Sequence, residues 1–76
     1  MHIGGVLLGA GMVLSLLPGD YFNGNDRLRF MIGRVVGVDG VWVILDGYQR
    51  PTPACGWRSR RVRVRIEALK RSLSLV

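Results

Sequence analysis

Residues 33–50 read GRVVGVDGVWVILDGYQR, and this stretch decides the predicted fold. Two runs rich in β-branched residues meet at Asp39-Gly40, a pair that suits a two-residue reversing turn. A type I′ turn needs positive φ at both central residues, which Asp tolerates and Gly adopts freely. The stretch therefore predicts a β-hairpin with its turn at Asp39-Gly40.

The strand before this turn alternates between apolar and other residues. Leu28, Phe30 and Ile32 fall on one face and are predicted to lie in the core. The alternation breaks at Gly33-Arg34, and a glycine at such a break is typical of a bulge or bend. Because small barrels use strongly bent strands to pass from one sheet to the other, the break favours a barrel.

The strand after the turn is apolar on both faces, with Val43 and Leu45 on one side and Trp42 and Ile44 on the other. Such a strand is either central in a sheet or docks a partner with one face. The pair Asp46-Gly47 is interpreted as a second turn or a bulge.

The last strand is the clearest, since Val62, Val64 and Ile66 alternate with charged residues. The preceding stretch, PTPACGW, is interpreted as a loop because its prolines cannot donate ladder hydrogen bonds. The following stretch, ALKRSLSLV, is interpreted as a helical turn or a frayed tail whose leucines cover one mouth of the barrel.

The composition agrees with a one-domain β fold. Of the 76 residues, 49% are hydrophobic and eleven are glycine, which excludes a disordered chain and favours short strands over long helices. We predict an all-β, single-domain fold, namely a small SH3-like β-barrel of five strongly bent strands, with a two-sheet meander as the alternative. Predicted strands lie near residues 13–22, 28–38, 41–46, 47–51 and 60–68.

The N-terminal residues form a separate part of this prediction. Residues 1–17 contain no Asp, Glu, Lys or Arg. They are short of the roughly 20 apolar residues that a transmembrane helix needs, and they lack the basic segment of a signal peptide. We expect a cytoplasmic protein without membrane contact, in which residues 1–11 form a flexible or packing arm, residues 12–69 the barrel and residues 70–76 a tail.

The formal net charge of +6 is unevenly distributed. Residues 58–71 contain seven Lys and Arg residues against Glu67 alone, whereas the four arginines before Arg58 are balanced by four aspartates. An anionic partner would therefore meet the C-terminal part of the chain.

A candidate nucleic-acid interface follows from this charge. Alternate residues of a strand lie about 6.6 Å apart, close to one phosphate step, so a row of arginines could neutralise several phosphates. A simpler interpretation is that alternating Val and Arg mark a half-buried edge strand. The predicted contact residues are Arg58, Arg60, Arg61, Arg63 and Arg65, with Trp57 as a stacking residue.

The alternative function is protein interaction or self-assembly through an apolar surface. Trp42, Ile44 and Tyr48 are the candidate contacts, together with the N-terminal arm. The partner would be a second copy of the chain or a host protein. Trp42 and Tyr48 are also candidate stacking residues, although a tryptophan in the middle of a strand is usually part of the core.

Catalysis, metal binding and cofactor binding are not expected. Cys55 has no second cysteine for a disulfide or a Cys-based zinc site. His2 stands at the N-terminus without fixed neighbours, and each aspartate lies beside Gly or Asn in a predicted turn or next to one. We therefore predict a protein that is not an enzyme.

The segments RLRFMIGRVVGVDGVWVILDGYQ and RRVRVRIEAL resemble a group of small uncharacterised actinobacterial proteins that phages and mobile elements also carry. The shared pattern is an arginine-rich strand, a GxWVxLDGY-like strand and a last strand that contains RR. The resemblance covers roughly residues 18–69. It implies a β fold and a phage or mobile-element context, and no activity.

Overall fold

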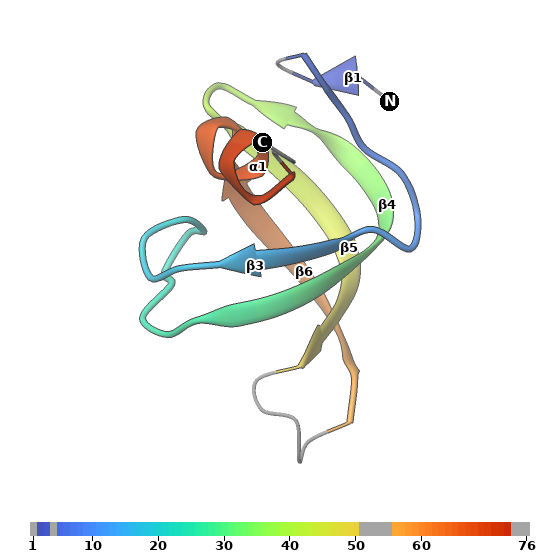
Figure 1. Ribbon diagram of the computed structural model, residues 1–76, viewed down its shortest axis with the longest axis vertical. Coiled ribbons are helices and arrows are strands. Elements are labelled where there is room, and N and C mark those ends of the chain that lie inside the picture. The colour runs from blue at the N-terminus through green and yellow to red at the C-terminus, as the bar shows by residue number, and fades with distance from the viewer. Residues whose placement is uncertain (1, 4, 51–55, 74–76) are drawn as a thin grey trace.

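In a computed structural model, the chain forms four antiparallel strands curled into a half-barrel, followed by a short C-terminal helix (Figure 1). The structure describes residues 2–3, 5–50 and 56–73. The main sheet has the order β3-β4-β5-β6, and β1 and β2 form a separate two-stranded hairpin. The elements are β1 (His2–Ile3), β2 (Val6–Leu7), β3 (Val13–Leu16), β4 (Leu28–Asp39), β5 (Trp42–Arg50), β6 (Arg58–Arg65) and α1 (Ile66–Leu73).

The inner face of the half-barrel is the hydrophobic core. The predicted core residues of β4, namely Leu28, Phe30 and Ile32, are all buried, as are Val62 and Val64 of β6. These predictions from strand alternation are confirmed. The other buried apolar residues are Leu8, Leu14, Leu16, Tyr21, Val43, Leu45, Ala68 and Leu69.

The β4–β5 hairpin is present, but its turn lies one residue later than predicted. Asp39 pairs with Trp42, so the two turn residues are Gly40 and Val41. Gly40 has φ +61°, and Asn23 is the only non-glycine residue in the described part of the chain with positive φ. A turn with glycine of positive φ in first place and a residue of negative φ, here Val41, in second place is type II′ and not the predicted type I′. The difference arises because Asp39 pairs in the ladder and does not enter the turn.

The break at Gly33 is a β-bulge, as predicted. Ile32 pairs with Gly47 and Arg34 pairs with Asp46, so Gly33 has no opposite residue. A second register shift between Val35 and Gly37 leaves out one more residue of β4. Bulges bend a strand and increase its twist, and β4 accordingly curves around the core (Figure 1).

Of the two interpretations of Asp46-Gly47, the turn is wrong, because β5 runs unbroken through both residues. The ladder does have a bulge at this position, but the extra residue is Gly33 on β4. The predicted strands 41–46 and 47–51 are therefore one strand as far as Arg50, and the sheet has four strands instead of five. Gly47 allows β4 and β5 to approach each other closely. A Cβ there would overlap the backbone oxygen of Met31 and lie 2.9 Å from the Phe30 ring.

The predicted strand at 13–22 is also divided. β3 ends at Leu16, and Asp20 closes a turn by accepting a 2.7 Å hydrogen bond from the Leu17 backbone N–H. After the turn, Tyr21 forms an isolated bridge to Val64 of β6. The chain between β3 and β4 thus lies along the edge of β6 and partly closes the half-barrel.

The all-β prediction is corrected by α1. The predicted strand at 60–68 is confirmed as far as Arg65, where β6 ends, and a helix follows over Ile66–Leu73. The helix thus includes the start of the predicted tail at 70–76, of which residues 74–76 lie outside the described part of the chain. The segment IEALKRSL is rich in good helix formers. α1 packs against β3 and β6, the two outer strands of the sheet, and buries Ala68 and Leu69. The Ser15 backbone N–H also donates to the Ser72 hydroxyl at 3.0 Å.

Candidate nucleic-acid interface

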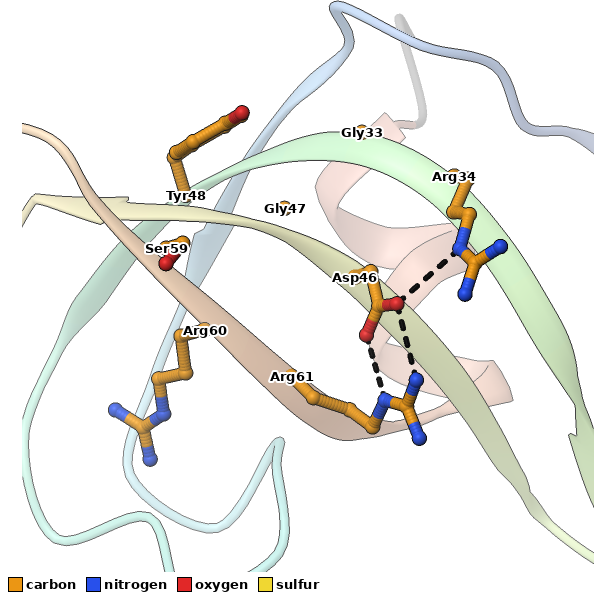
Figure 2. Close-up of a pocket in the computed structure, with 8 residues that line it drawn as sticks. All are labelled: Gly33, Arg34, Asp46, Gly47, Tyr48, Ser59, Arg60 and Arg61. Atoms are coloured by element: carbon orange, nitrogen blue, oxygen red, sulfur yellow. Dashed lines mark hydrogen bonds and ion pairs between the residues drawn. The ribbon is translucent and has the colours of Figure 1, made fainter.

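The five predicted arginines do not lie on one face of β6. Val62 and Val64 point into the core, so Arg61, Arg63 and Arg65 project from the outer face. Arg58 and Arg60 occupy the same alternate positions as Val62 and Val64, so they lie on the other face of β6. Figure 2 shows the Arg60 side chain leaving β6 away from that of Arg61.

Arg60 and Trp57 belong to other parts of the molecule. The Arg60 guanidinium donates to the Gln49 side-chain oxygen and lies 5.6 Å from the centre of the Tyr21 ring, where it supports the segment that closes the half-barrel. Trp57 precedes β6, at the end opposite Arg65, and the Arg50 guanidinium lies 5.8 Å from its ring centre. Arg58 is exposed near Trp57 in the chain.

Arg61 forms an ion pair within the sheet. Its Nε and Nη2 donate to the two carboxylate oxygens of Asp46 at 2.6 and 3.1 Å. Arg34 Nε donates to Asp46 Oδ2 at 3.2 Å from the other side (Figure 2). We call Arg34, Asp46 and Arg61 the Asp46 clamp. Residue pairing across β4, β5 and β6 places all three in one row.

The clamp fixes the charge of its members. The hydrogen bond from Arg61 is the largest cause that lowers the pKa of Asp46 to about 2. Desolvation is the next largest and opposes it, and the hydrogen bond from Arg34 and the charges of both arginines lower the pKa further. The hydrogen bond that Arg61 donates to Asp46 also raises the pKa of Arg61. Two cations thus share one anion, and the clamp keeps a net positive charge.

Arg63 and Arg65 lie over aromatic rings on the outer face. The Arg63 guanidinium is 5.9 Å from the centre of the Phe22 ring, and that of Arg65 is 5.0 Å from the centre of the Trp42 ring. The two rings meet edge to face at 5.9 Å. Neither arginine forms an ion pair with any residue that the structure describes. Arg65 Nε donates to the Gly19 carbonyl at 3.2 Å.

Phe22 was missed by the sequence prediction. Its ring is brought to β6 because the Phe22 N–H donates to the Arg63 carbonyl and the Arg65 N–H donates to the Asp20 carbonyl, both at 2.9 Å. Local sequence carries no signal of this pairing between distant segments. We call Phe22, Trp42, Arg61, Arg63 and Arg65 the arginine–aromatic face.

The candidate contacts of the alternative function share the outer face. Trp42 and Ile44 are partly buried there, and Tyr48 is 45% exposed. Ile44, Phe22 and Val36 line a hollow of about 460 Å³ beside Arg61 and Arg63. Apolar and cationic side chains are therefore interleaved on one surface.

No helix in the described ranges combines the length and apolar character needed to cross a membrane. Within the same ranges, no three His, Cys, Asp or Glu side chains gather as a possible metal site. Comparison of the chain with protein-family models, with curated proteins and with solved structures finds no match in any of the three. The resemblance to small actinobacterial proteins stays a prediction, and the function must be argued from the chain itself.

Proposed function

We propose that this protein is a non-enzymatic nucleic-acid-binding module and that its contact surface is the arginine–aromatic face. The observation that carries the proposal is the placement of Arg63 and Arg65. They project side by side from one strand, lie over aromatic rings and have no acidic partner among the described residues. A surface that only needs solvation usually mixes charges of both signs.

The spacing of the cations suits a phosphate backbone. Arg61, Arg63 and Arg65 occupy alternate positions of β6, about 6.6 Å apart along the strand. A guanidinium can donate two parallel hydrogen bonds to a phosphate, which a lysine cannot do. Each phosphate that is neutralised also releases counterions, so the binding must weaken as salt is added.

The aromatic rings supply the second element of recognition. Phe22 is 53% exposed, and its ring lies between Arg63 and Trp42. Proteins that bind single strands combine a basic track with aromatic rings on which bases stack.

We also propose a closer assignment of the fold, namely an SH3-like barrel, because the segment that carries Phe22 joins the edge of β6.

The proposal predicts the salt dependence of binding. We would measure the binding of labelled mixed-sequence DNA and RNA by fluorescence anisotropy at several salt concentrations. Three phosphate contacts give a slope of log K against log salt of about −2 for a single strand. Replacement of two of them, in Arg63→Gln/Arg65→Gln, should reduce the slope to about −0.7.

A charge-matched control is Arg27→Gln/Arg29→Gln. Both arginines are exposed, and Arg29 pairs with Arg50 at the opposite end of β4 from the hairpin turn. This variant should keep the slope of the wild type. The proposal fails if the wild type does not bind at low salt, or if both double variants lose affinity equally.

A second candidate function, protein interaction, is favoured by the apolar hollow at Val36 and Ile44. An exposed apolar surface of this kind can receive a partner protein or a second copy. A sizing column distinguishes the two functions. A discrete oligomer that Ile44→Ser dissociates, combined with no nucleic-acid binding, would favour this candidate.

A further inference from the structure

We propose that a hollow between Tyr48 and the Asp46 clamp receives one unpaired nucleobase, so that the preferred ligand is single-stranded nucleic acid. This inference rests on the proposed function and adds the ligand class and a base-binding position to it. The hollow lies on the outer face of β4, β5 and β6 and has a volume of about 490 Å³. That volume is within the range of small-molecule sites.

The floor of the hollow is backbone. Gly33 and Gly47 line it there with backbone alone (Figure 2). A Cβ at Gly47 would point away from the hollow, toward the Met31 backbone and the buried Phe30 ring. Gly33 is the bulged residue of β4, and a bulged residue is left unpaired in the ladder. A Cβ at Gly33 would approach the Asp46 backbone oxygen to 3.1 Å, so a larger residue at this position would crowd the β5 backbone.

The two walls differ in chemistry. Tyr48 forms one wall, with Ser59 opposite it across the β5–β6 pair, and its ring is exposed enough to stack. The Asp46 clamp forms the other wall and offers a carboxylate beside two guanidiniums (Figure 2). The edge of a base carries hydrogen-bond donors and acceptors together, which suits a wall that has both.

The hollow offers a surface to one face of a base and to its edge. Tyr48 and Asp46 are two residues apart on one face of β5, so their Cα atoms lie about 6.6 Å apart along the strand. The exposed Tyr48 ring can stack on one face of a base whose edge meets the Asp46 clamp. A base pair within a duplex keeps its faces stacked on its neighbours and cannot use the Tyr48 ring in this way.

The hollow is continuous with the proposed phosphate contacts. Arg61 lines it and also belongs to the arginine–aromatic face, with Arg63 and Arg65 further along β6. A strand that follows β6 would place phosphates on these arginines and reach the hollow with its next base. A duplex could meet the arginines but could not supply an unpaired base.

The test compares Tyr48→Ala with Tyr48→Phe. The probes are a labelled 12-nucleotide oligothymidine or oligouridine and a mixed-sequence duplex of equal length, measured by anisotropy at low salt. Loss of one stacked base should weaken single-strand binding by Tyr48→Ala about tenfold. Duplex binding and the salt slope should not change, and Tyr48→Phe should bind single strands like the wild type.

The outcomes separate this inference from the proposed function. If Tyr48→Ala weakens the single strand and the duplex equally, or neither, the base-binding position is wrong while phosphate binding stands. If the wild type binds duplex as tightly as single strand, the ligand class is wrong. If the wild type binds neither probe, the proposed function fails and this inference fails with it. Circular dichroism of each variant checks that the fold is retained.

Discussion

Asp46 determines how the charge on the outer face is arranged. Sequence alone placed it in a turn, where an aspartate satisfies backbone donors. In the structure it stands inside β5 and accepts hydrogen bonds from Arg34 on one side and Arg61 on the other. One carboxylate thus pairs with two guanidiniums, while Arg63 and Arg65 form no ion pair within the described residues.

The lowered pKa of Asp46 predicts a loss of stability in acid. Its value is about 2 in the folded protein against 3.8 for the free group. Above about pH 5 the carboxylate is charged in both states, and its stabilising effect is complete. Between about pH 5 and pH 2 the unfolded chain takes up a proton at this group before the folded chain does, so the free energy of unfolding must fall as the pH falls. Urea denaturation followed by circular dichroism from pH 2 to 6 measures this.

Asp46→Asn should remove that part of the pH dependence and destabilise the protein at neutral pH. Asp39→Asn is the matched control, because Asp39 is exposed and forms no ion pair within the described residues. An unchanged acid profile in Asp46→Asn would contradict the role given to the clamp.

The helix α1 is held to the sheet by a buried carboxylate. Asp20 is 8% exposed, accepts from the Leu17 N–H and forms an ion pair with Arg71 of α1. The turn after β3 and the C-terminal helix therefore depend on one side chain. Helix docking in turn covers Leu69, which is fully buried.

Asp20→Ala should lower the free energy of unfolding by about 2 kcal/mol, because a buried donor loses a charged acceptor. Arg71→Gln should cost less than about 1 kcal/mol, since the Arg71 side chain is half exposed. Urea denaturation of the two variants provides the comparison. Equal losses in both would show that the ion pair, and not the turn, carries the effect.

At the level of elements, the sequence predicted the strands better than their ends. Alternation of apolar residues located β4 and β6, and the break in it located the bulge at Gly33. The turn predicted at Asp46-Gly47 is wrong because an Asp-Gly pair is typical of turns, whereas Gly47 is needed here for the close approach of two strands. The start of the helix is ambiguous in the sequence for a similar reason, because Ile66 and Ala68 also continue the apolar alternation of β6.

At the level of the whole molecule, stability should be highest in the middle of the sheet. Val43 and Leu45 lie on β5 between β4 and β6 and are fully buried. β1 and β2 have two residues each and form a separate sheet. Hydrogen exchange followed by NMR should find the slowest amides in β5 and fast exchange in β1 and β2. Equal protection would mean that the N-terminal hairpin unfolds together with the core.

The candidate site was predictable only in part. Strand alternation placed Arg61, Arg63 and Arg65 on one side, and the structure keeps them there. No local pattern indicates that Asp46 forms an ion pair with Arg61 or that the Phe22 ring lies near Arg63. Both contacts join residues far apart in the chain, so they depend on register and closure and not on local pattern.

The rings beneath Arg63 and Arg65 have a consequence for how tightly an anion can be held. A free arginine side chain loses up to about 2 kcal/mol of rotamer entropy when it is immobilised. Here Phe22 and Trp42 already restrict the two guanidiniums in the folded protein. Part of that entropy is lost on folding, before any ligand arrives, so the side chains meet an anion already pre-organised.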